Sequence, residues 1–471
     1  MPIGACDYHC LLLIGNCFSQ SITWQRSYNS QFNQSDYGED VCEADGDNFY
    51  IVGASQTVNT AHVMYILKIN KFGDTLWSRN IDGAWAKAVT RSNDGGCVVT
   101  GITDALPFAL KLTPDGNIVW NRTYGTSNIG FYGNDIISTP DGGYIGCAAV
   151  YYNIGYIFKI DSLGNFQWDR FYQGGYSKSF SRIINASDSG YVLVGTERFT
   201  QTDTARGIIC KIGTKGNIVW ENNYRVNNAS TSFYNLENVN NSFLVSGGYF
   251  DGDFFRVFLK RLDLEGVEYY SKVFESINDE FKIRCKVINS NRYVLSVGKW
   301  AFTPTRTYAK LLIIDSLCNI QMQKNYDAPG DLEVNSILKT DNEDILFTGF
   351  AEYSFYADVY VLRTDSLLNA PPPIGIGYTS NSLPMTHSLT NYPNPFNAST
   401  KFIYSINKPQ LVKLIIYDLT GRVIDILSDN KNQVGTFELL WNSNGLATGV
   451  YFVSLYAGNI RVLTKKIVLL K

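Results

Sequence analysis

Histidine is almost missing from this sequence. The chain of 471 residues contains only His9, His62 and His387, which lie far apart. A Ser-His-Asp triad needs an imidazole beside its nucleophile, and many zinc sites need two or three of them. The sequence also contains no G-x-S-x-G, no P-loop and no H-E-x-x-H motif. We therefore expect no catalytic residues, no cofactor and no metal site.

Charge is also scarce, at 18% of the residues, and nearly balanced, with a net charge of −3. A nucleic-acid-binding domain usually carries a basic patch that contacts the phosphate backbone. Basic residues cluster here only at Lys465, Lys466 and Lys471. Beyond the first twenty residues no apolar run reaches the ~18 residues that a membrane span needs. We therefore expect no nucleic-acid partner and no membrane span.

The nine cysteines include no C-x-x-C pair of the kind that zinc sites and redox motifs use. Three of them, Cys6, Cys10 and Cys17, precede residue 20. The other six occur singly, mostly within apolar strand patterns, so we expect buried free thiols. Disulfides are the alternative, because an oxidising compartment permits them. These six are Cys42, Cys97, Cys147, Cys210, Cys285 and Cys318.

Glycine and aromatic residues are abundant instead. The chain has 40 Gly, 31 Tyr and 27 Phe, and 45% of its residues are hydrophobic. Aromatic residues favour strands and glycine favours turns, so this composition indicates an all-β protein with many short strands. Because single cores stop growing at roughly 250 to 300 residues, we expect two or more domains, or a repeat array with an appendage.

One short pattern recurs seven times along the chain. Each copy is an apolar strand that follows a polar or glycine turn, as in the segment GYIGCAAV, and successive copies begin 47–52 residues apart. This period lies in the range of β-propeller blades. The copies begin at Asn48, Gly96, Gly143, Gly190, Ser242, Arg292 and Asp344.

Each unit also carries a second apolar strand, a tight turn and an aromatic strand. In the third unit the turn runs from Asp161 to Gly164, and the aromatic strand carries Trp168 and Tyr172. Asp opens such a turn by bonding its own backbone, and Gly supplies a positive φ. A short strand precedes each copy, for example at residues 135–138, so each unit has the four antiparallel strands of a propeller blade.

The D-x-x-G-x-x-x-W pattern resembles the turn-and-tryptophan motifs of quinoprotein-type and Asp-box propellers. The resemblance implies that tryptophans such as Trp120 and Trp168 dock one blade on the next. A quinone-dependent oxidoreductase is a further alternative for the function, and it predicts that a chromophore copurifies with the protein.

The seventh unit lacks its aromatic strand. Pro371, Pro372 and Pro373 follow its turn, and proline cannot donate to a strand ladder. The missing motif lies at the other end of the chain, where Trp24 and Tyr28 match the aromatic strand in type and spacing. We therefore predict a seven-bladed β-propeller closed by its N-terminal strand, which removes an exposed sheet edge.

The first segment resembles a secretory signal peptide. An apolar run at residues 11–14 precedes Cys17 and Ser19, two small residues at the positions expected before a cleavage site. The segment lacks a Lys or Arg before this run, and a buried N-terminal strand is the alternative. We predict four parts in all: a signal peptide at 1–19, the propeller at 20–370, a flexible linker rich in Pro, Gly, Ser and Thr at 371–391, and a C-terminal domain at 392–471.

The C-terminal domain shows alternating strand patterns and four short motifs. They are Tyr-Pro-Asn-Pro-Phe at 392–396, Ile-Tyr-Asp-Leu-Thr-Gly-Arg at 416–422, Leu-Ala-Thr-Gly-Val-Tyr at 446–451 and Thr-Lys-Lys-Ile-Val-Leu at 464–469. In this order and at the end of the chain, these motifs resemble the type A C-terminal sorting domain of the type IX secretion system. A generic immunoglobulin-like domain, whose glycines merely serve turns, is the alternative.

The resemblance implies a small Ig-like β-sandwich that the type IX machinery of a Gram-negative bacterium recognises at the outer membrane. The protein would then be secreted or fixed to the cell surface. The positions that fall in the family's signatures, and that we expect in recognition of the sorting signal, are Tyr392, Pro393, Asn394, Pro395, Gly449, Tyr451, Lys466 and Val468.

Two kinds of side chain in the propeller are candidates for a site. Acidic clusters lie at 36–40, 45–47 and 251–253, of which Asp45-Gly46-Asp47 resembles a calcium loop only loosely and is better interpreted as a polar turn. Aromatic pairs or groups lie in loops at 131–132, 151–152 and 353–356, where they could stack on sugars or on a protein.

The resemblance to the sorting domain implies only how the protein is delivered, because this domain occurs on many unrelated proteins. We favour an exported, non-catalytic propeller that binds a glycan or a protein ligand. The alternative is a propeller enzyme that acts on extracellular polysaccharide through paired carboxylates at its central funnel, because a propeller brings distant acids together there.

Overall fold

The structure is a computed structural model that describes residues 22–470 apart from 33, 60–61, 104–105, 125–130, 151–153, 253–254, 275–279, 303–304, 329, 354–355, 372–387, 428–431, 444 and 459. The described elements are all β-strands, which confirms the all-β prediction. Within this part of the chain no helix is long and apolar enough to span a membrane. The predicted signal peptide, its three cysteines and His387 lie outside the described residues.

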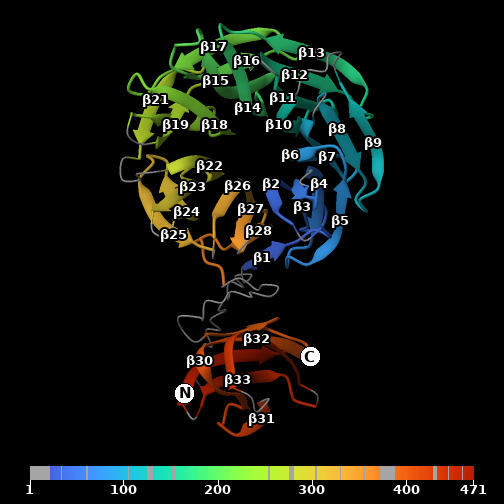
Figure 1. Cartoon of the computed structure of the whole chain (residues 1–471), viewed down its shortest axis with the longest axis vertical. Helices are drawn as coiled ribbons and strands as arrows, with labels where there is room; N and C mark the ends of the chain where they lie inside the picture. The colour runs from blue at the N-terminus through green and yellow to red at the C-terminus, as the bar shows by residue number, and fades with distance from the viewer. Residues whose placement is uncertain are drawn as a thin grey trace, which may run out of the picture. The chain divides into compact units, whose positions relative to one another are not determined.

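The chain divides into two compact units. One takes the residues up to Ala351 together with Ala357–Pro372, and the other takes Glu352–Tyr356 and the residues from Pro373 on. Figure 1 shows that the larger unit is a ring of antiparallel sheets. Seven sheets of four strands make up this ring, and the pairing of β7 with β10 joins two of them at one point. The ring is the predicted seven-bladed β-propeller.

The first four blades each take consecutive strands from the axis outwards. Blade one holds β2 (Asp36–Glu43), β3 (Phe49–Gln56), β4 (His62–Ile69) and β5 (Thr75–Ile81). Blade two holds β6 (Trp85–Arg91), β7 (Cys97–Thr103), β8 (Phe108–Leu112) and β9 (Ile118–Thr123). Blade three holds β10 (Phe131–Ser138), β11 (Tyr144–Val150), β12 (Ile154–Ile160) and β13 (Phe166–Tyr172). Blade four holds β14 (Ser177–Asn185), β15 (Tyr191–Arg198), β16 (Arg206–Ile212) and β17 (Ile218–Tyr224).

The last three blades follow the same order, except that the seventh takes its rim strand from the start of the chain. Blade five holds β18 (Ser230–Asn238), β19 (Phe243–Phe250), β20 (Phe255–Leu262) and β21 (Glu268–Val273). Blade six holds β22 (Glu280–Asn289), β23 (Arg292–Phe302), β24 (Thr305–Asp315) and β25 (Ile320–Tyr326). Blade seven holds β26 (Leu332–Lys339), β27 (Ile345–Tyr353), β28 (Tyr356–Thr364) and β1 (Trp24–Tyr28).

The apolar core lies between neighbouring blades. The middle strands β3 and β8 are buried along nearly all of their length, whereas most of the rim strand β9 is exposed. Tyr50 and Ile66 of blade one, for example, share a core cluster with Val99 and Leu110 of blade two. The continuous apolar runs in the sequence are therefore strands that bury both of their faces against adjacent blades.

In blade three, the turn before the rim strand is built by an acidic side chain and a glycine. Asp161 Oδ1 accepts hydrogen bonds from the backbone N–H groups of Leu163 and Asn165 at 2.9 and 2.8 Å, and Gly164 has a φ of +75°. Both features are those that the sequence predicts for this turn. The same pair of hydrogen bonds from backbone N–H groups recurs at Asp263, Asp315 and Asp365.

Side chains of each rim strand contact the turn of the next blade. Tyr124 donates a hydrogen bond to the carbonyl oxygen of Gly164 at 3.0 Å, and the ring of Trp120 lies where a Cβ atom on Gly164 would come within 2.9 Å. We call this contact the rim clamp. It is present at all seven blade interfaces, through Tyr28, Trp77, Tyr124, Tyr172, Tyr224, Tyr270 and Tyr326. The tryptophans therefore serve as inter-blade contacts, as the sequence predicts.

The ring closes through the N-terminal strand. β1 pairs with β28 over the whole stretch from Trp24 to Tyr28 and so becomes the rim strand of blade seven. The indole N–H of Trp24 then donates to the carbonyl oxygen of Lys71 at 2.9 Å, and the Tyr28 hydroxyl donates to that of Gly73 at 2.8 Å. Lys71 and Gly73 lie in the turn of blade one, so the predicted closure is confirmed.

The six cysteines that follow residue 20 are free thiols, as predicted. Five are buried and Cys42 is partly exposed. Burial raises the pKa of these thiols, for example of Cys97 to about 12. A thiol held protonated in this way is a poor nucleophile.

The smaller unit is a separate β-structure around its own core. Its strands are β29 (Ser388–Tyr392), β30 (Ser399–Tyr417), β31 (Val423–Leu427), β32 (Asn432–Asn442), β33 (Gly449–Ala457) and β34 (Ile460–Leu469). β30 pairs with β29 and β32 mainly through its first part and with β31 and β33 through its last part. One strand thus joins two small sheets, and Phe402, Trp441 and Val453 pack in the core between them. The immunoglobulin-like label for this unit stays a prediction.

Replacing Gly164 with alanine should destabilise the propeller through the rim clamp. The positive φ costs an alanine about 1–2 kcal/mol, and the clash with Trp120 adds an overpacking cost of about 1–3 kcal/mol. Gly83 is the matched control, because its φ is +89° but an added Cβ meets nothing within 4 Å. Chemical denaturation measures the free energy of unfolding of both variants and of the unaltered protein. An equal loss of unfolding free energy in Gly164→Ala and Gly83→Ala would contradict the clamp.

Candidate functional site

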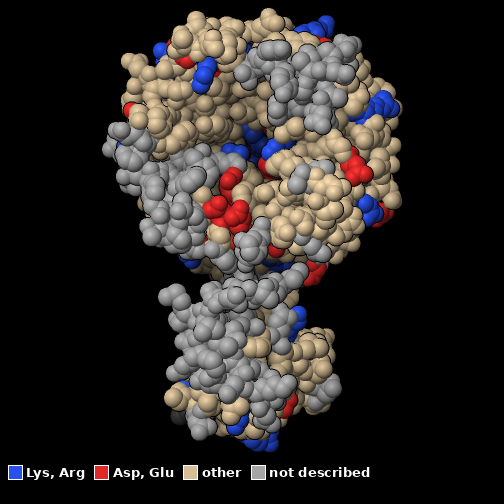
Figure 2. Space-filling view, in the orientation of Figure 1, with Lys and Arg blue, Asp and Glu red and all other residues tan. Residues whose placement is uncertain are grey.

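The inner strands of the seven blades surround a cavity of about 230 Å³ at the axis of the ring. Figure 2 shows basic side chains inside this central opening. The lining is almost entirely polar or charged and comes from β2, β6, β10, β14, β18, β22 and β26. The lining residues are Glu39, Asp40, Lys87, Asn134, Ser181, Arg182, Tyr234, Arg284 and Asn335.

Six of these residues reach the cavity because they are the extra residue of a β-bulge. In β2, for example, the pairing with β3 skips from Gly38 to Asp40, which leaves Glu39 unpaired. A bulge inserts one residue into a strand and re-aims side chains there. The other bulged residues are Lys87, Asn134, Ser181, Tyr234 and Asn335. The inner strand of blade six has its bulges elsewhere, and it contributes Arg284.

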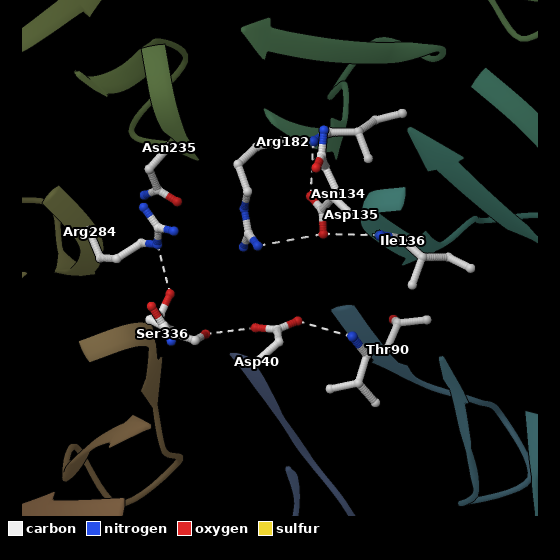
Figure 3. A network of polar contacts seen from close by, with 12 residues as sticks. Asp40, Thr90, Asn134, Asp135, Ile136, Arg182, Asn235, Arg284 and Ser336 are labelled. Carbon is white, nitrogen blue, oxygen red and sulfur yellow. Dashed lines mark hydrogen bonds and ion pairs between the residues drawn. The ribbon is translucent and has the colours of Figure 1, made fainter. Parts of the chain in front are cut away.

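Two carboxylates near the axis hold neighbouring blades together (Figure 3). Asp40 of blade one accepts from the Ser336 hydroxyl of blade seven at 2.7 Å and from the Val89 backbone N–H of blade two at 3.0 Å. Asp135 of blade three accepts from the Ile183 backbone N–H of blade four at 2.9 Å. Both side chains are nearly fully buried. The carboxylate oxygens that accept these hydrogen bonds therefore take part in contacts between blades.

Asparagine side chains extend the same linkage around the ring. Asn134 donates to the carbonyl oxygen of Phe180 at 2.6 Å, which joins blades three and four. Asn335 donates to the carbonyl oxygen of Gly38 at 2.7 Å, which joins blades seven and one. Asn235 makes the equivalent bond from blade five to blade six. Since a buried amide that is left unpaired is costly, these bonds fix the positions of the inner strands.

Three basic side chains reach the cavity from blades two, four and six. Lys87 Nζ lies 2.6 Å from Glu39 Oε1, and Arg182 Nη1 lies 3.5 Å from Asp135 Oδ1. Arg284 donates from Nε to the carbonyl oxygen of Asn335 at 2.7 Å and from Nη1 to that of Ile283 at 3.1 Å. Among the residues that the structure describes, no carboxylate pairs with Arg284. Figure 3 shows Arg182 and Arg284 extending inwards from opposite sides of Asn235.

The two guanidinium groups differ in their electrostatic surroundings. The charge of Asp135 raises the pKa of Arg182, so this group is held firmly in its charged form. Burial, followed by the charge of Arg182, lowers the pKa of Arg284. The two guanidinium groups thus repel each other, and of the two only Arg182 forms an ion pair with a described carboxylate.

A second acidic feature lies where blade seven meets blade one. Asp36, at the start of β2, is fully buried and accepts from the Ser30 backbone N–H at 2.6 Å. Asp358, in β28, is partly buried. Burial, followed by the charge of Asp36, raises the pKa of Asp358 to about 6, and burial also raises the pKa of Asp36. We call these two residues the seam pair.

The remaining acidic residues named from the sequence lie in ordinary ion pairs. Asp45 pairs with Arg91, and Asp47 Oδ2 lies 3.5 Å from Lys71 Nζ. Asp251 Oδ2 lies 2.7 Å from Arg256 Nε, and Asp253 lies outside the described residues. In the described part of the chain, no three His, Cys, Asp or Glu residues are grouped as metal ligands. Asp45 and Asp47 are therefore parts of a polar turn.

The structure describes only some of the candidate aromatic and histidine residues. The ring of His62 stacks on Trp85, with 4.8 Å between the ring centroids. Tyr356 is exposed. Residues 151–152 and 354–355 and the side chains of Phe131 and Tyr132 lie outside what the structure describes. Phe131 and Tyr132 begin strand β10 and Tyr356 begins β28, so their predicted position in loops is wrong. A binding role for these residues stays a prediction.

The sorting-signal residues of the smaller unit meet at its terminal strand. The side chain of Asn394 donates to the carbonyl oxygen of Lys466 at 3.2 Å and accepts from the Val468 backbone N–H at 2.8 Å. Pro393 bonds through its carbonyl oxygen to the Thr400 hydroxyl at 2.8 Å. Asn394 thus contacts two other signature positions, which lie 72 and 74 residues further along the chain. Recognition of these residues by the secretion machinery stays a prediction.

The other predicted signature positions lie on the strands beside this contact. Tyr392 is partly exposed at the end of β29, and Pro395 follows Asn394 directly. Gly449 begins β33, which pairs with β34 through Val450 and Val468. The Tyr451 hydroxyl donates to the carbonyl oxygen of Ala447 at 2.8 Å.

The seam pair should make the propeller more stable in mild acid. The raised pKa of Asp358 means that the folded state prefers its protonated form, so this stability is present below about pH 4 and is lost as the pH rises through about 6. The change is at most about 3 kcal/mol and smaller after solvent screening. Asp358→Asn should raise the unfolding temperature at pH 7.5 and leave it unchanged near pH 4. Asp115→Asn, at an exposed turn, is the control, and identical pH profiles for the two variants would contradict the pairing.

Comparison with known proteins bears on both units. Residues 390–470 match the family model of the secretion system C-terminal sorting domain. No curated relative matches the chain. Among solved structures, the Dos1 propeller is 12% identical with a TM-score of 0.47 and covers 81% of this chain and 92% of its own. YCF48 bound to D1 peptide is also 12% identical with a TM-score of 0.47, over 74% of this chain and 96% of its own.

A third similar structure is the periplasmic gluconolactonase of Pseudomonas aeruginosa. It is 10% identical with a TM-score of 0.41, over 62% of this chain and 88% of its own. At this level of identity the likeness concerns the fold alone. The sorting domain, by contrast, indicates the route that the protein takes. The chain is a β-propeller that carries a type IX C-terminal sorting domain and is exported to the cell surface or secreted.

Proposed function

We propose that this protein is a non-catalytic binding module of the cell surface or the secreted fraction, and that its ligand enters the central cavity of the propeller. One observation carries the proposal: the described carboxylates at the axis are engaged in contacts between blades, whereas the guanidinium groups keep N–H donors without partners. Groups that hold a ligand must be free to contact it. The free groups here are donors.

Hydrolysis at the same cavity fits these contacts poorly. A glycoside hydrolase needs one carboxyl group that protonates the leaving group and a second that acts as nucleophile or base. Asp40 accepts one bond on each of its oxygens from two different blades. Protonating it would weaken contacts that hold the ring together. The cavity therefore suits recognition better than acid and base catalysis.

The two units of the chain have different partners in this proposal. The sorting domain meets the type IX secretion machinery and delivers the protein. The propeller then binds a glycan or a protein outside the cell. Nothing in the fold requires that one unit take part in the task of the other, because each has its own core.

The seam pair supports a second candidate, an enzyme that acts on extracellular polysaccharide. Two neighbouring carboxyl groups, of which one has a pKa of about 6, have the protonation states that general acid catalysis near neutral pH needs. Asp36 is fully buried, however, and its carboxylate accepts a backbone hydrogen bond. This burial is why we rank the enzyme second.

Replacing Asn394 with alanine should impair delivery of the protein. The change removes two of the hydrogen bonds that hold residues 393–396 to the terminal strand, each worth about 0.5–1.5 kcal/mol. Protease accessibility on intact cells and immunoblots of the medium measure delivery. Leu419→Ala is the control, because this side chain is 70% exposed. Normal delivery of a chain that lacks residues 390–470 would contradict the role of the sorting domain.

A ligand screen on the full-length protein separates the binding module from the enzyme. The protein is applied to a glycan array and to extracellular extracts, and the same polysaccharides are assayed for new reducing ends. We expect retention of a ligand without turnover, and loss of retention when Arg284 is replaced by glutamine. Release of reducing ends that disappears in Asp358→Asn would overturn the binding module and favour the enzyme.

A further inference from the structure

We propose that the central cavity binds a small carboxylate, of the size of one sugar acid, between the guanidinium groups of Arg182 and Arg284. This inference rests on the proposed function and names the chemistry of the ligand. It follows from three properties of the lining: which hydrogen-bonding groups are free, how the like charges are placed, and how much room there is.

The free hydrogen-bonding groups of the cavity are mainly donors. A guanidinium carries five N–H bonds on three nitrogens. Arg284 uses Nε and Nη1 for backbone carbonyls, which leaves Nη2 without a protein partner among the described residues. Arg182 Nε is buried and has no hydrogen-bond partner there either. A buried donor that the protein does not satisfy is costly. An anion in the cavity can accept from Arg284 Nη2 and is attracted by the charge of Arg182.

The acidic side chains of the lining do not compete for these donors. Glu39 is paired with Lys87, and Asp40 is bonded to Ser336 and Val89. Asp135 faces Arg182 but also accepts two backbone N–H groups. The lining itself holds three cations and two carboxylates, because Asp135 lies beside it. Arg284 makes no ion pair with a described carboxylate, although the charges of Glu39, Glu333 and Asp40 act on it from nearby.

The placement of the two arginines favours an anion between them. They belong to blades four and six, and burial, followed by the charge of Arg182, lowers the pKa of Arg284. An anion placed between two cations replaces this repulsion with two attractions. Because the inner strands are tied together around the ring, the two side chains cannot simply move apart.

The size and the neutral lining favour an organic carboxylate over a larger polyanion. A cavity of about 230 Å³ is smaller than the 300–1,000 Å³ of most drug-sized sites. Tyr234 is the one aromatic residue among the nine in the lining, which also includes Ser181 and Asn134 with their polar groups. An aromatic face beside polar groups is the usual lining for a sugar ring.

Titration calorimetry of the full-length protein tests the site, with sodium glucuronate as the probe and glucose as its neutral match. We expect one saturable site for glucuronate, no detectable binding of glucose, and a higher unfolding temperature with glucuronate only. Arg284→Gln should weaken binding about 10- to 100-fold, as expected when one charged hydrogen-bonding group is lost. Arg284→Lys keeps the charge without the planar fork and should weaken binding less.

Arg91→Gln is the matched control, because Arg91 lies on the inner strand β6 but pairs with the exposed Asp45 outside the cavity. Its affinity for glucuronate should equal that of the unaltered protein. Equal affinity for glucuronate and glucose, or an affinity that Arg284→Gln leaves unchanged, would overturn the site. Binding of inorganic sulfate as tight as that of glucuronate would overturn the assignment to a carboxylate. If Arg284→Gln does not fold, the thermal shifts of the unaltered protein decide the question.

Failure of this inference can be distinguished from failure of the proposed function. A protein that retains a glycan in the screen but does not bind glucuronate contradicts the carboxylate site alone. A protein that binds glucuronate at the cavity but also releases reducing ends from polysaccharide contradicts the non-catalytic function alone.

Discussion

The contact between a rim strand and the turn of the next blade is the interaction on which this propeller depends. A four-stranded blade with two apolar faces cannot stay in water alone, so each must be covered by its neighbours. Apolar packing supplies the attraction but does not set the angle between blades. The rim clamp sets it, because a tyrosine hydroxyl or an indole N–H of the rim strand must reach a carbonyl oxygen in the turn of the next blade. An indole ring also lies against the glycine of that turn at Gly116, Gly164, Gly216 and Gly266. Repeated seven times, the hydrogen-bonded contact closes a ring.

The rim clamp could be predicted from the sequence because its parts recur. Trp120 and Gly164 stand at matching places in several units, and the motif that is missing from the seventh unit appears at Trp24 and Tyr28. Turn chemistry is local, since Asp161 bonds to N–H groups within four residues of itself. Local rules and a regular period were sufficient to predict the fold and its closure.

The lining of the cavity could not be predicted in the same way. Lys87, Arg182 and Arg284 each occur once, in units that otherwise match, and the positions of Lys87 and Arg182 depend on where a bulge falls in the pairing of two strands. Of the acidic residues 36–40 that the sequence indicates as candidates, Glu39 and Asp40 line the cavity, whereas no sequence pattern indicated the basic residues there. The lining residues could have been sought by aligning the inner strands of the seven units and noting the position at which the residue type differs most.

This contrast explains how a rigid repeat can carry a specific site. Each blade is held at both of its edges. The rim clamps hold its outer strand, and the hydrogen bonds of Asp40, Asp135 and the asparagines hold the inner strands. A bulged residue is unpaired in its own strand, so its side chain can vary without breaking the ladder. Six such positions converge on one axis, and each can change independently. Specificity therefore resides in the residues that the repeat leaves free, while delivery resides in the unit that does not repeat.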